Sequence, residues 1–373
     1  MRTLTLPRFS GIWLGCVALF GFGFLLNPNT LSSSSIYSML PFFAILAIAS
    51  LGQTMVVMQR GLDLSVPGAI AAAAVAFTRM ANVRDDQVLQ GVVLAFAVVA
   101  LAGLVAGIAV TRFHVTPLVA TLGTNALLLA FTNWYSGGFP TGAPDGMNQF
   151  ALGKALGLVP NMVLVLLVLV LVAQALLRYS VLGRRFVAVG INPRAARAVG
   201  IPVERYVVGT YVVASLFYGL AGIFLASFIK TPPIFSGTQY LLGTVAAVVL
   251  GGTALGGGVG SFIATVGGAL FLSQLNAIVL GVGLPNSLQQ VVQALAIVLV
   301  VGLRSVPWHR LKRAAPGPVP GAAGPAGPAD PAAAAVLPDG PAGTATPVDL
   351  GSPDADQASS SGRVAGGTPA EAG

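Results

Sequence analysis

The stretch LGRRFVAVGINPRAARAVGIPVERY, residues 182–206, separates two long apolar runs and decides how the rest of the chain is interpreted. The wider segment from Arg178 to Arg205 carries six arginines and a single acid, Glu204. Short basic loops between apolar spans face the cytoplasm in membrane proteins. Residues 179–205 are therefore predicted to form an ordered cytoplasmic loop that can receive a partner or a force from the cell interior.

A short helix is predicted inside this loop. Asn192 is placed to cap it, and Pro193 suits its first position because a helix does not use the N–H group there. Gly200 and Pro202 provide the stop signal. The predicted helix runs from Pro193 to Val199.

The faces of this helix suggest how it would be used. Arg194 and Arg197 are three positions apart and share one face. A second face of low relief, suited to a partner's groove, is expected from Ala195, Ala196, Ala198 and Val199. The alternative is that the helix lies on lipid headgroups and that its arginines only follow the charge bias of membrane proteins.

The composition identifies a membrane protein. Of 373 residues, 55% are hydrophobic and 8% are charged, and the mean hydropathy is +0.85. Soluble domains contain about 25% charged residues. Residues 1–313 hold 18 of the 19 Lys and Arg but 5 of the 11 acids, a net charge of +13, and the last 60 residues carry −5. The basic residues lie between apolar spans, so membrane topology explains them better than binding to nucleic acid.

The predicted fold class is an all-α polytopic membrane protein with about ten transmembrane helices, some broken or short. A spanning helix needs about 20 mostly apolar residues. The expected spans are residues 11–27, 35–58, 64–81, 89–111, 116–135, 158–178, 206–229, 240–256, 260–281 and 286–303. The eighth is rich in glycine and is expected to be bent or short. Cys16, the sole cysteine, falls in the first span and is expected to face lipid or to be packed.

The charge bias predicts that both ends of the chain are cytoplasmic, because the loops on that side would hold most of the Lys and Arg. Residues 1–313 form the predicted transmembrane domain. Residues 314–373 are rich in Pro, Ala and Gly and are expected to be a disordered cytoplasmic tail. The tail is assigned no activity.

An acid interrupts two apolar runs in the segment QRGLDLSVPGA, residues 59–69. Asp63 must be hydrated, hydrogen-bonded or paired at such a membrane break. Asp63 and Ser65 could cap the following span, with Pro67 and Gly68 in its first turn. Capping is favoured over contact with a transported solute.

A second irregular stretch, GTVAAVVLGGTALGGGVGSF at residues 243–262, concentrates glycines and includes Gly251, Gly252 and Thr253. Glycines allow close helix approach and local unwinding. The Lys followed by Ser or Thr of a phosphate-binding loop is missing, so ATP hydrolysis by this chain is not expected. The two histidines, His114 and His309, have no acid or cysteine cluster beside them, and neither a catalytic site nor a metal site is predicted.

Four motifs in this order resemble the permease subunits of bacterial ABC importers for monosaccharides, the ribose, xylose and galactose type related to branched-chain amino acid permeases. They are GLDLSVPG at 61–68, VTPLVATLG at 115–123, LGRRFVAVGINPRAARAVGI at 182–201 and AAVVLGGTALGGGVG at 246–260. The resemblance covers about residues 35–303. Arg60 departs from it, since the family signature has a glycine there.

The resemblance implies a paired permease, most simply a homodimer, that works with a cytoplasmic ATPase and an extracytoplasmic solute-binding protein. The segment from Asn192 to Gly200 looks like the coupling helix that docks on the ATPase. Asp63 and Ser65 match the DLS of the family signature, and Gly251 to Thr253 match its GGT. ATP and Mg would be bound by the ATPase, with no cofactor on this chain.

The resulting prediction is a multi-pass permease of the bacterial plasma membrane, surrounded by lipid, that imports a small sugar. Its pathway is expected near spans 2, 3, 5 and 8, with Thr124, Asn125 and Asn133 as candidate polar residues, although packing hydrogen bonds explain them equally well. One alternative is a branched-chain amino acid or nucleoside permease of the same architecture. A secondary transporter is another, but those usually carry more ionisable residues in their spans.

Overall fold

The computed structural model describes residues 10–281, apart from 156 and 158, together with residues 283, 291, 294, 295 and 298. Internal contacts divide the chain into two units, Met1–Leu311 and Lys312–Gly373. The expected tail, residues 314–373, lies outside the described residues. So does the expected tenth span, residues 286–303, apart from four isolated positions.

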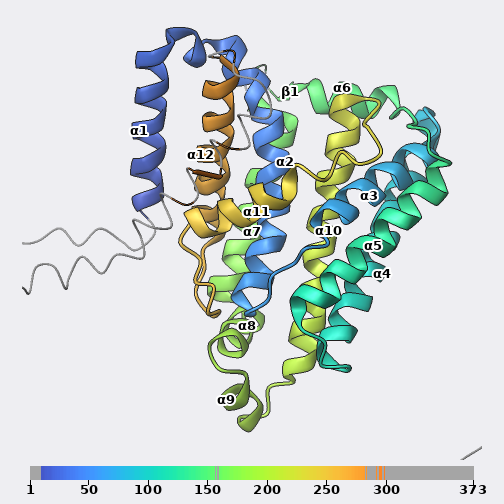
Figure 1. Cartoon of the computed structure of the whole chain (residues 1–373), viewed down its shortest axis with the longest axis vertical. Helices are drawn as coiled ribbons and strands as arrows, with labels where there is room; N and C mark the ends of the chain where they lie inside the picture. Colours follow the sequence, from blue (N-terminus) through green and yellow to red (C-terminus); the bar gives the residue numbers. More distant parts are fainter. Residues whose placement is uncertain are drawn as a thin grey trace, which may run out of the picture. The chain divides into compact units, whose positions relative to one another are not determined.

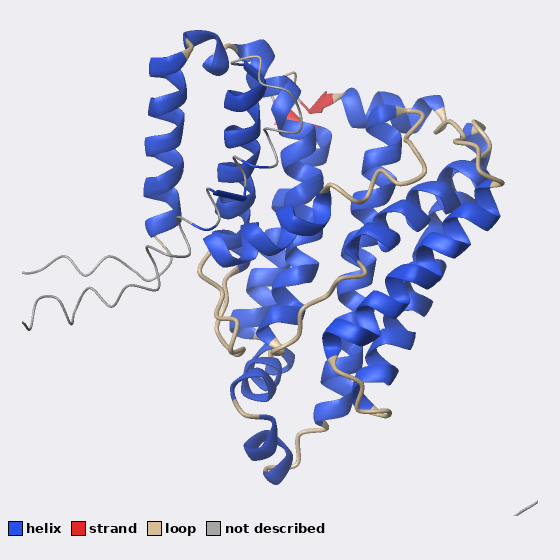
Figure 2. Ribbon diagram, in the orientation of Figure 1, coloured by secondary structure: helices blue, strands red, loops and turns tan. Residues whose placement is uncertain are grey.

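The described part of the chain is mainly helical (Figures 1 and 2). The helices that correspond to expected spans are α1 (Gly11–Leu26), α2 (Ser33–Met58), α3 (Val66–Ala81), α4 (Val88–Thr111), α5 (Pro117–Ser136), α7 (Asn161–Tyr179), α10 (Val203–Ile229), α11 (Tyr240–Leu250) and α12 (Phe262–Gly281). The nine expected spans before residue 282 thus each coincide with a helix. Within the described residues, five helical segments are long and apolar enough to cross a membrane, and α1, α3 and α11 are shorter apolar helices.

Shorter elements join these helices. They are η1 (Pro28–Leu31), η2 (Asp85–Gln87), α6 (Asp145–Leu152), α8 (Val181–Ile191), α9 (Pro193–Ala198) and an antiparallel pair, β1 (Lys154–Ala155) with β2 (Val159–Pro160). Helices α6 and α8 were not expected from the sequence. Ser180 caps the start of α8, since its Oγ accepts a hydrogen bond from the Gly183 N–H at 2.9 Å.

The centre of the bundle is formed by α2, α3 and α10. Nearly every residue of α3 is buried, and its run of alanines lets neighbouring helices approach closely. Helix α10 packs against α2, α3 and α4. Helices α2, α3 and α10 therefore form the core around which the others are arranged.

The outer helices present apolar side chains away from the core. Leu101 of α4, Leu127 of α5 and Leu171 of α7 are each more than 60% exposed. Exposed leucines in such numbers would drive aggregation in water but suit a lipid environment. Cys16 faces inward from α1 instead, since it is 4% exposed and its Sγ contacts the Gly267 carbonyl of α12 at 3.3 Å.

The two ends of the bundle carry different elements (Figure 1). Helix α6 and strand β1 lie at one end, and α8 and α9 lie at the other. At the α6 end, Lys230 and Asp145 form an ion pair at 2.6 Å. The arginines of residues 178–205 belong to the α8 and α9 end. An uneven distribution of Arg and Lys between the two ends is typical of membrane proteins.

The eighth span ends earlier than the sequence suggested. Helix α11 stops at Leu250 because Gly252 adopts a left-handed conformation with φ of +83°. The Thr253 N–H then donates to the Val248 carbonyl at 3.2 Å, and the Gly252 N–H donates to that of Val249 at 2.9 Å. This is the glycine-terminated helix end that satisfies the last free carbonyls. The expected limit of 256 was wrong, whereas the expectation of a short helix is confirmed.

Replacing Gly222 with alanine tests the close approach of α10 to α3. A Cβ atom there would overlap the carbonyl oxygen of Ile70, so we expect Gly222→Ala to reduce the free energy of unfolding by about 1–3 kcal/mol. Gly209 of the same helix has open space around its Cα, so Gly209→Ala should be neutral or stabilising by up to about 1 kcal/mol. Thermal unfolding in detergent measures both, and equal midpoints for the two variants would contradict this packing.

Candidate functional site

The chain leaves α2 at Met58 and runs without regular structure to the start of α3, which begins deep within the bundle (Figure 1). Asp63 and Ser65 lie in this segment and are 1% and 2% exposed. Asp63 Oδ1 accepts hydrogen bonds from the Ser65 N–H at 2.8 Å and from Ser65 Oγ at 2.6 Å. The acid therefore stabilises a tight turn immediately before α3, which we call the α3 break, residues 59–65.

The expected capping of α3 by Ser65 is wrong in its detail. Ser65 is the residue at the cap position, but its side chain makes no capping hydrogen bond because its hydroxyl donates to Asp63. The cap comes from α5 instead. Asn125 Oδ1 accepts from the Gly68 N–H at 2.8 Å, and Thr121 Oγ1 accepts from the Leu64 N–H at 3.0 Å.

Irregular backbone at membrane depth is stable only where protein or a water-filled cavity satisfies its polar groups. Helix α5 provides this through Thr121 at the α3 break and through Asn125 in the first turn of α3. The fit is close, since a Cβ on Gly68 would lie 2.9 Å from both oxygens of Asn125. Asn125, expected as a candidate pathway residue, thus holds the first turn of α3. Thr121, which was not expected from the sequence, accepts from the backbone one turn earlier, at Leu64.

A small polar centre surrounds the buried acid. The Tyr218 hydroxyl of α10 donates to Gln53 Oε1 of α2 at 3.0 Å, and the Asp63 carboxylate lies close enough to Tyr211 and Tyr218 to interact electrostatically with both. Among the described residues, Gln53 Nε2 is buried without a hydrogen-bond partner. The break is thereby linked to the two central helices. Gln53 could have been selected from the sequence, because it is a polar amide within the apolar run of residues 35–58.

The remaining polar candidates of α5 do not join this centre. Thr124 is buried, and its Oγ1 donates to the Ala120 carbonyl of its own helix at 2.9 Å. Asn133 is exposed near the end of α5, and its carbonyl accepts from Ser136 Oγ. The structure therefore groups Asn125 with Asp63 and Ser65, and leaves Asn133 apart.

Gly251, Gly252 and Thr253 form a separate feature. They end α11, as described above, and Gly251 packs against the backbone of Ala264 and Thr265 in the first turn of α12. The Thr253 hydroxyl is buried and has no hydrogen-bond partner among the described residues. These residues shape the link between α11 and α12 and do not contact the α3 break through any hydrogen bond of the described region.

The predicted helix in the basic loop is present as α9, Pro193–Ala198. Asn192 Oδ1 accepts from the N–H groups of Arg194 and Ala195, both at 3.1 Å, so the expected cap is confirmed. The helix ends one residue earlier than expected. Gly200 has φ of +79°, and the N–H of Ile201 donates to the Ala196 carbonyl at 3.0 Å.

One residue of the expected low-relief face points inward. Ala196 is 3% exposed and packs with Val189 of α8 and Val203 of α10. A helix of this length buries whichever face its flanking helices cover, and the sequence carries no signal for that choice. The outward surface of α9 therefore comprises Ala195, Ala198 and Val199, with the exposed Arg194 and Arg197.

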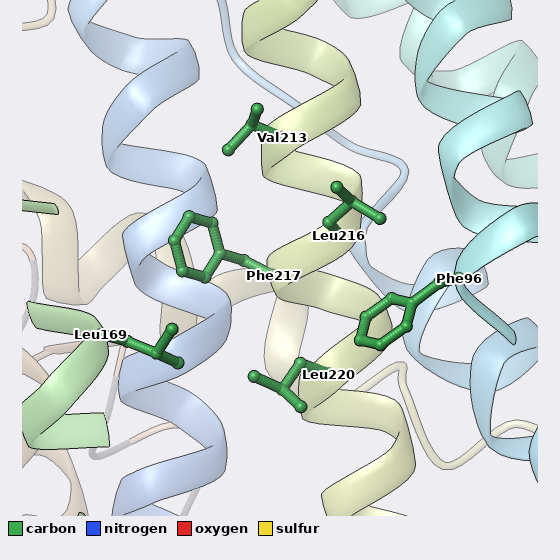
Figure 3. A pocket seen from close by; sticks show the side chains of 6 residues that line it. All are labelled: Phe96, Leu169, Val213, Leu216, Phe217 and Leu220. Atoms are coloured by element: carbon green, nitrogen blue, oxygen red, sulfur yellow. The ribbon is translucent and has the colours of Figure 1, made fainter. Parts of the chain in front are cut away.

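A hollow of about 500 Å³ lies elsewhere in the bundle (Figure 3). Its lining comes from α4, α7 and α10 and consists of Phe96, Leu169, Val213, Leu216, Phe217 and Leu220. No polar side chain lines it. Sites for polar solutes combine apolar walls with a few well-placed hydrogen-bonding groups, so this hollow suits hydrocarbon chains and not a sugar.

The comparisons with known proteins agree with this architecture. Residues 35–301 match the family described as "Branched-chain amino acid transport system / permease component". That match covers most of the chain, and the protein therefore belongs to this family of permease components. It is a polytopic membrane protein with a transport role.

Several curated relatives are similar over most of their length. The ribose import permease protein RbsC of Escherichia coli strain K12 is 33% identical over 281 residues, which are 74% of this chain and 87% of that protein. The ribose import permease protein RbsC of Bacillus subtilis strain 168 is 34% identical over 295 residues, 78% and 91% respectively. The autoinducer 2 import system permease protein LsrC of Enterobacter sp. strain 638 is 33% identical over 286 residues, 76% and 83%. No solved structure matches the chain.

The role of Asn125 is tested by replacing it with alanine. Asn125→Ala would leave the Gly68 N–H without an acceptor inside the bundle, and we expect a loss of about 1–3 kcal/mol in the free energy of unfolding. Asn133→Ala is the matched control on the same helix, because that side chain is exposed. Thermal unfolding in detergent separates the two, and equal losses would contradict the cap.

Proposed function

We propose that this chain is the membrane permease of an ATP-driven importer that transfers a small sugar into a bacterial cell. The family match and the relatives named above support an import role. The observation that carries the proposal is α9. It is a capped helix that projects at one end of the bundle between α8 and α10, with two exposed arginines on it.

A projecting helix of this kind suits docking on an ATPase. The exposed Ala195 and Ala198 are small, so a groove can enclose that face, and Arg194 and Arg197 offer donors to acidic groups on the groove's rim. The start and end of α9 are fixed by Asn192 and Gly200, so a push on the helix would be passed to α8 and α10. A pore that opens by itself has no need of such a fixed element.

The remaining parts of the importer would be separate subunits. A cytoplasmic ATPase would bind ATP and Mg, and this chain would bind no cofactor and hydrolyse nothing. An extracytoplasmic binding protein would deliver the solute at the end that carries α6. A second copy of this chain, or a paralogue, would complete the membrane part. Both termini would be cytoplasmic, since the basic loop with α9 carries the positive charge typical of that side.

A small sugar is the proposed solute because two of the relatives named above are ribose import permeases. The autoinducer 2 import permease is similarly close in identity, so a related polar metabolite is the second candidate. A branched-chain amino acid is a further candidate on the strength of the family description. A secondary transporter is disfavoured because coupled carriers place ionisable residues in their spans, and Asp63 is engaged by Ser65.

Uptake into proteoliposomes tests this function. The chain is reconstituted with its ATPase and binding protein, and labelled ribose, xylose, galactose, autoinducer 2 and leucine are offered in turn. We expect uptake of one sugar that requires both ATP and the ATPase. Uptake driven by an ion gradient without the ATPase would contradict the proposal and indicate a secondary transporter.

The docking role of α9 predicts a specific loss. Arg194→Glu combined with Arg197→Glu reverses the charge on the outward face of α9, and we expect uptake to fall by roughly a hundredfold, as expected when a few central interface contacts are lost. Both side chains are exposed, so the thermal unfolding of the permease should not change. Arg112→Glu is the control, because Arg112 is an exposed arginine after α4 and outside the loop. Normal uptake in the double variant would exclude α9 as the docking helix.

A further inference from the structure

Three segments that are distant in the sequence meet beside the start of α9. They are the end of α2 with the first residues of the α3 break, the last turns of α8, and the glycine-rich turn that follows α11. We call this meeting point the α2–α8 junction and define it by Met58, Gln59, Arg60, Gly190, Ile191 and Gly258.

Side-chain hydrogen bonds hold α8 to the end of α2. Gln59 Nε2 donates to the Phe186 carbonyl at 2.8 Å. Arg60 Nε donates to the Gly190 carbonyl at 2.8 Å, and its Nη2 donates to the carbonyl of Ile191. The guanidinium group thus binds two consecutive carbonyls at the C-terminal end of α8.

This arrangement has a clear physical basis. The last carbonyls of a helix lack partners within the helix and carry its partial negative charge. A guanidinium group offers several donors in a fixed plane, so one arginine can satisfy two of these carbonyls and neutralise that charge. Ile191 is followed directly by Asn192, the cap of α9. Arg60 therefore fixes the residues from which α9 starts.

The backbone conformation of Arg60 indicates that its side chain has a specific role. Arg60 has φ of +65°, a left-handed conformation that glycine adopts freely and that costs other residues free energy. A residue kept in such a conformation needs a compensating interaction, and the two hydrogen bonds to α8 supply one. An arginine at this position thus indicates a use for the guanidinium group.

The junction is packed too closely to slide. The Gly258 N–H donates to the Met58 carbonyl at 2.8 Å. A Cβ on Gly190 would overlap that same carbonyl, a Cβ on Gly258 would overlap Ile191, and a Cβ on Gly257 would overlap the Arg60 side chain. Since closely packed groups move together, a displacement of the end of α8 displaces the end of α2 and the glycine-rich turn with it.

We propose that Arg60 is a positioning residue that passes the movement of α9 to the α3 break. The route starts at α9, crosses from Ile191 and Gly190 to Arg60, and continues through the backbone to Asp63 and Ser65. From Leu64 in the break it reaches Thr121 of α5, and from Gly68 in the first turn of α3 it reaches Asn125. The proposal rests on the function proposed above, because it is the ATPase that would move α9.

The test measures uptake and ATP hydrolysis together in proteoliposomes that contain the whole importer. Arg60→Gly removes the guanidinium group and relieves the backbone, so the permease should still fold. We expect ATP hydrolysis near the parent level and sugar uptake per ATP reduced roughly tenfold, a size typical of lost coupling between distant sites. Arg60→Lys keeps the charge but loses the planar two-point contact, and should recover part of the uptake per ATP.

Arg112→Gly is the matched control. Arg112 is an exposed arginine that follows α4 and has right-handed backbone angles, with φ of −90°. We expect it to leave uptake per ATP unchanged. Unchanged uptake per ATP in Arg60→Gly would overturn the proposal.

Two further outcomes separate a failure of the proposed function from a failure of the role of Arg60. If the parent importer itself shows no ATPase-dependent uptake, the proposed function fails first and Arg60 is not the cause. If Arg60→Gly does not assemble, Arg60→Lys decides alone. Uptake per ATP equal to the parent in that variant would then contradict a role for the two-point contact, and a fall in uptake without a fall in hydrolysis would support it.

Discussion

The backbone of the α3 break sets the constraint on which the rest of the structure depends. Peptide groups inside an apolar bundle are costly unless something satisfies them, and lipid cannot. Three side chains from two elements perform this task at the start of α3, namely Asp63, Thr121 and Asn125. Helix α3 can begin inside the bundle only because α5 lies beside it in the correct register. The central packing of α2, α3 and α10 follows from that placement.

The same break connects the interior of the bundle to its basic end. One side of it is anchored to α5 by the hydrogen bond from Leu64 to Thr121, and the other side begins at Arg60, which binds the end of α8. Helix α9 lies immediately beyond. A transporter driven from outside the membrane needs an element that can be pushed and a connected element that responds. Here α9 and the α3 break are those two elements, and the α2–α8 junction lies between them.

Much of the fold could be predicted from the sequence because the membrane fixes the length of a helix. Apolar runs of about 20 residues identified the spans, and their limits agree closely with helices such as α1 and α12. The short helix α9 was also predictable, since Asn192, Pro193 and Gly200 are local signals. Helix α8 was missed because its short sequence combines apolar and basic residues with Gly183 and Gly190, a pattern that favours a loop.

The candidate site was predicted less well because it depends on contacts between distant residues. Asp63 and Ser65 were selected by their polarity, but Thr121, which binds the Leu64 N–H between them, lies on another helix. The burial of Ala196 reflects the packing of α8 and α10 around a short helix and leaves no trace in the local pattern. The pairing of Arg60 with Gly190 spans 130 positions, and no sequence rule connects them.

The central claim is that ATP on the partner ATPase moves the α3 break through α9 and Arg60. The most direct measurement is a distance between spin labels on Leu122, exposed beside Thr121 on α5, and Val17, exposed on α1. These residues are 52% and 72% exposed, and the only cysteine, Cys16, is buried, so introduced cysteines can be labelled selectively. Labelled chains would be diluted with unlabelled chains in the assembled importer, so that distances within one chain dominate. The account predicts that ATP shifts this distance in the parent chain and not in Arg60→Gly. The same shift in both chains, or no shift in the parent, would contradict it.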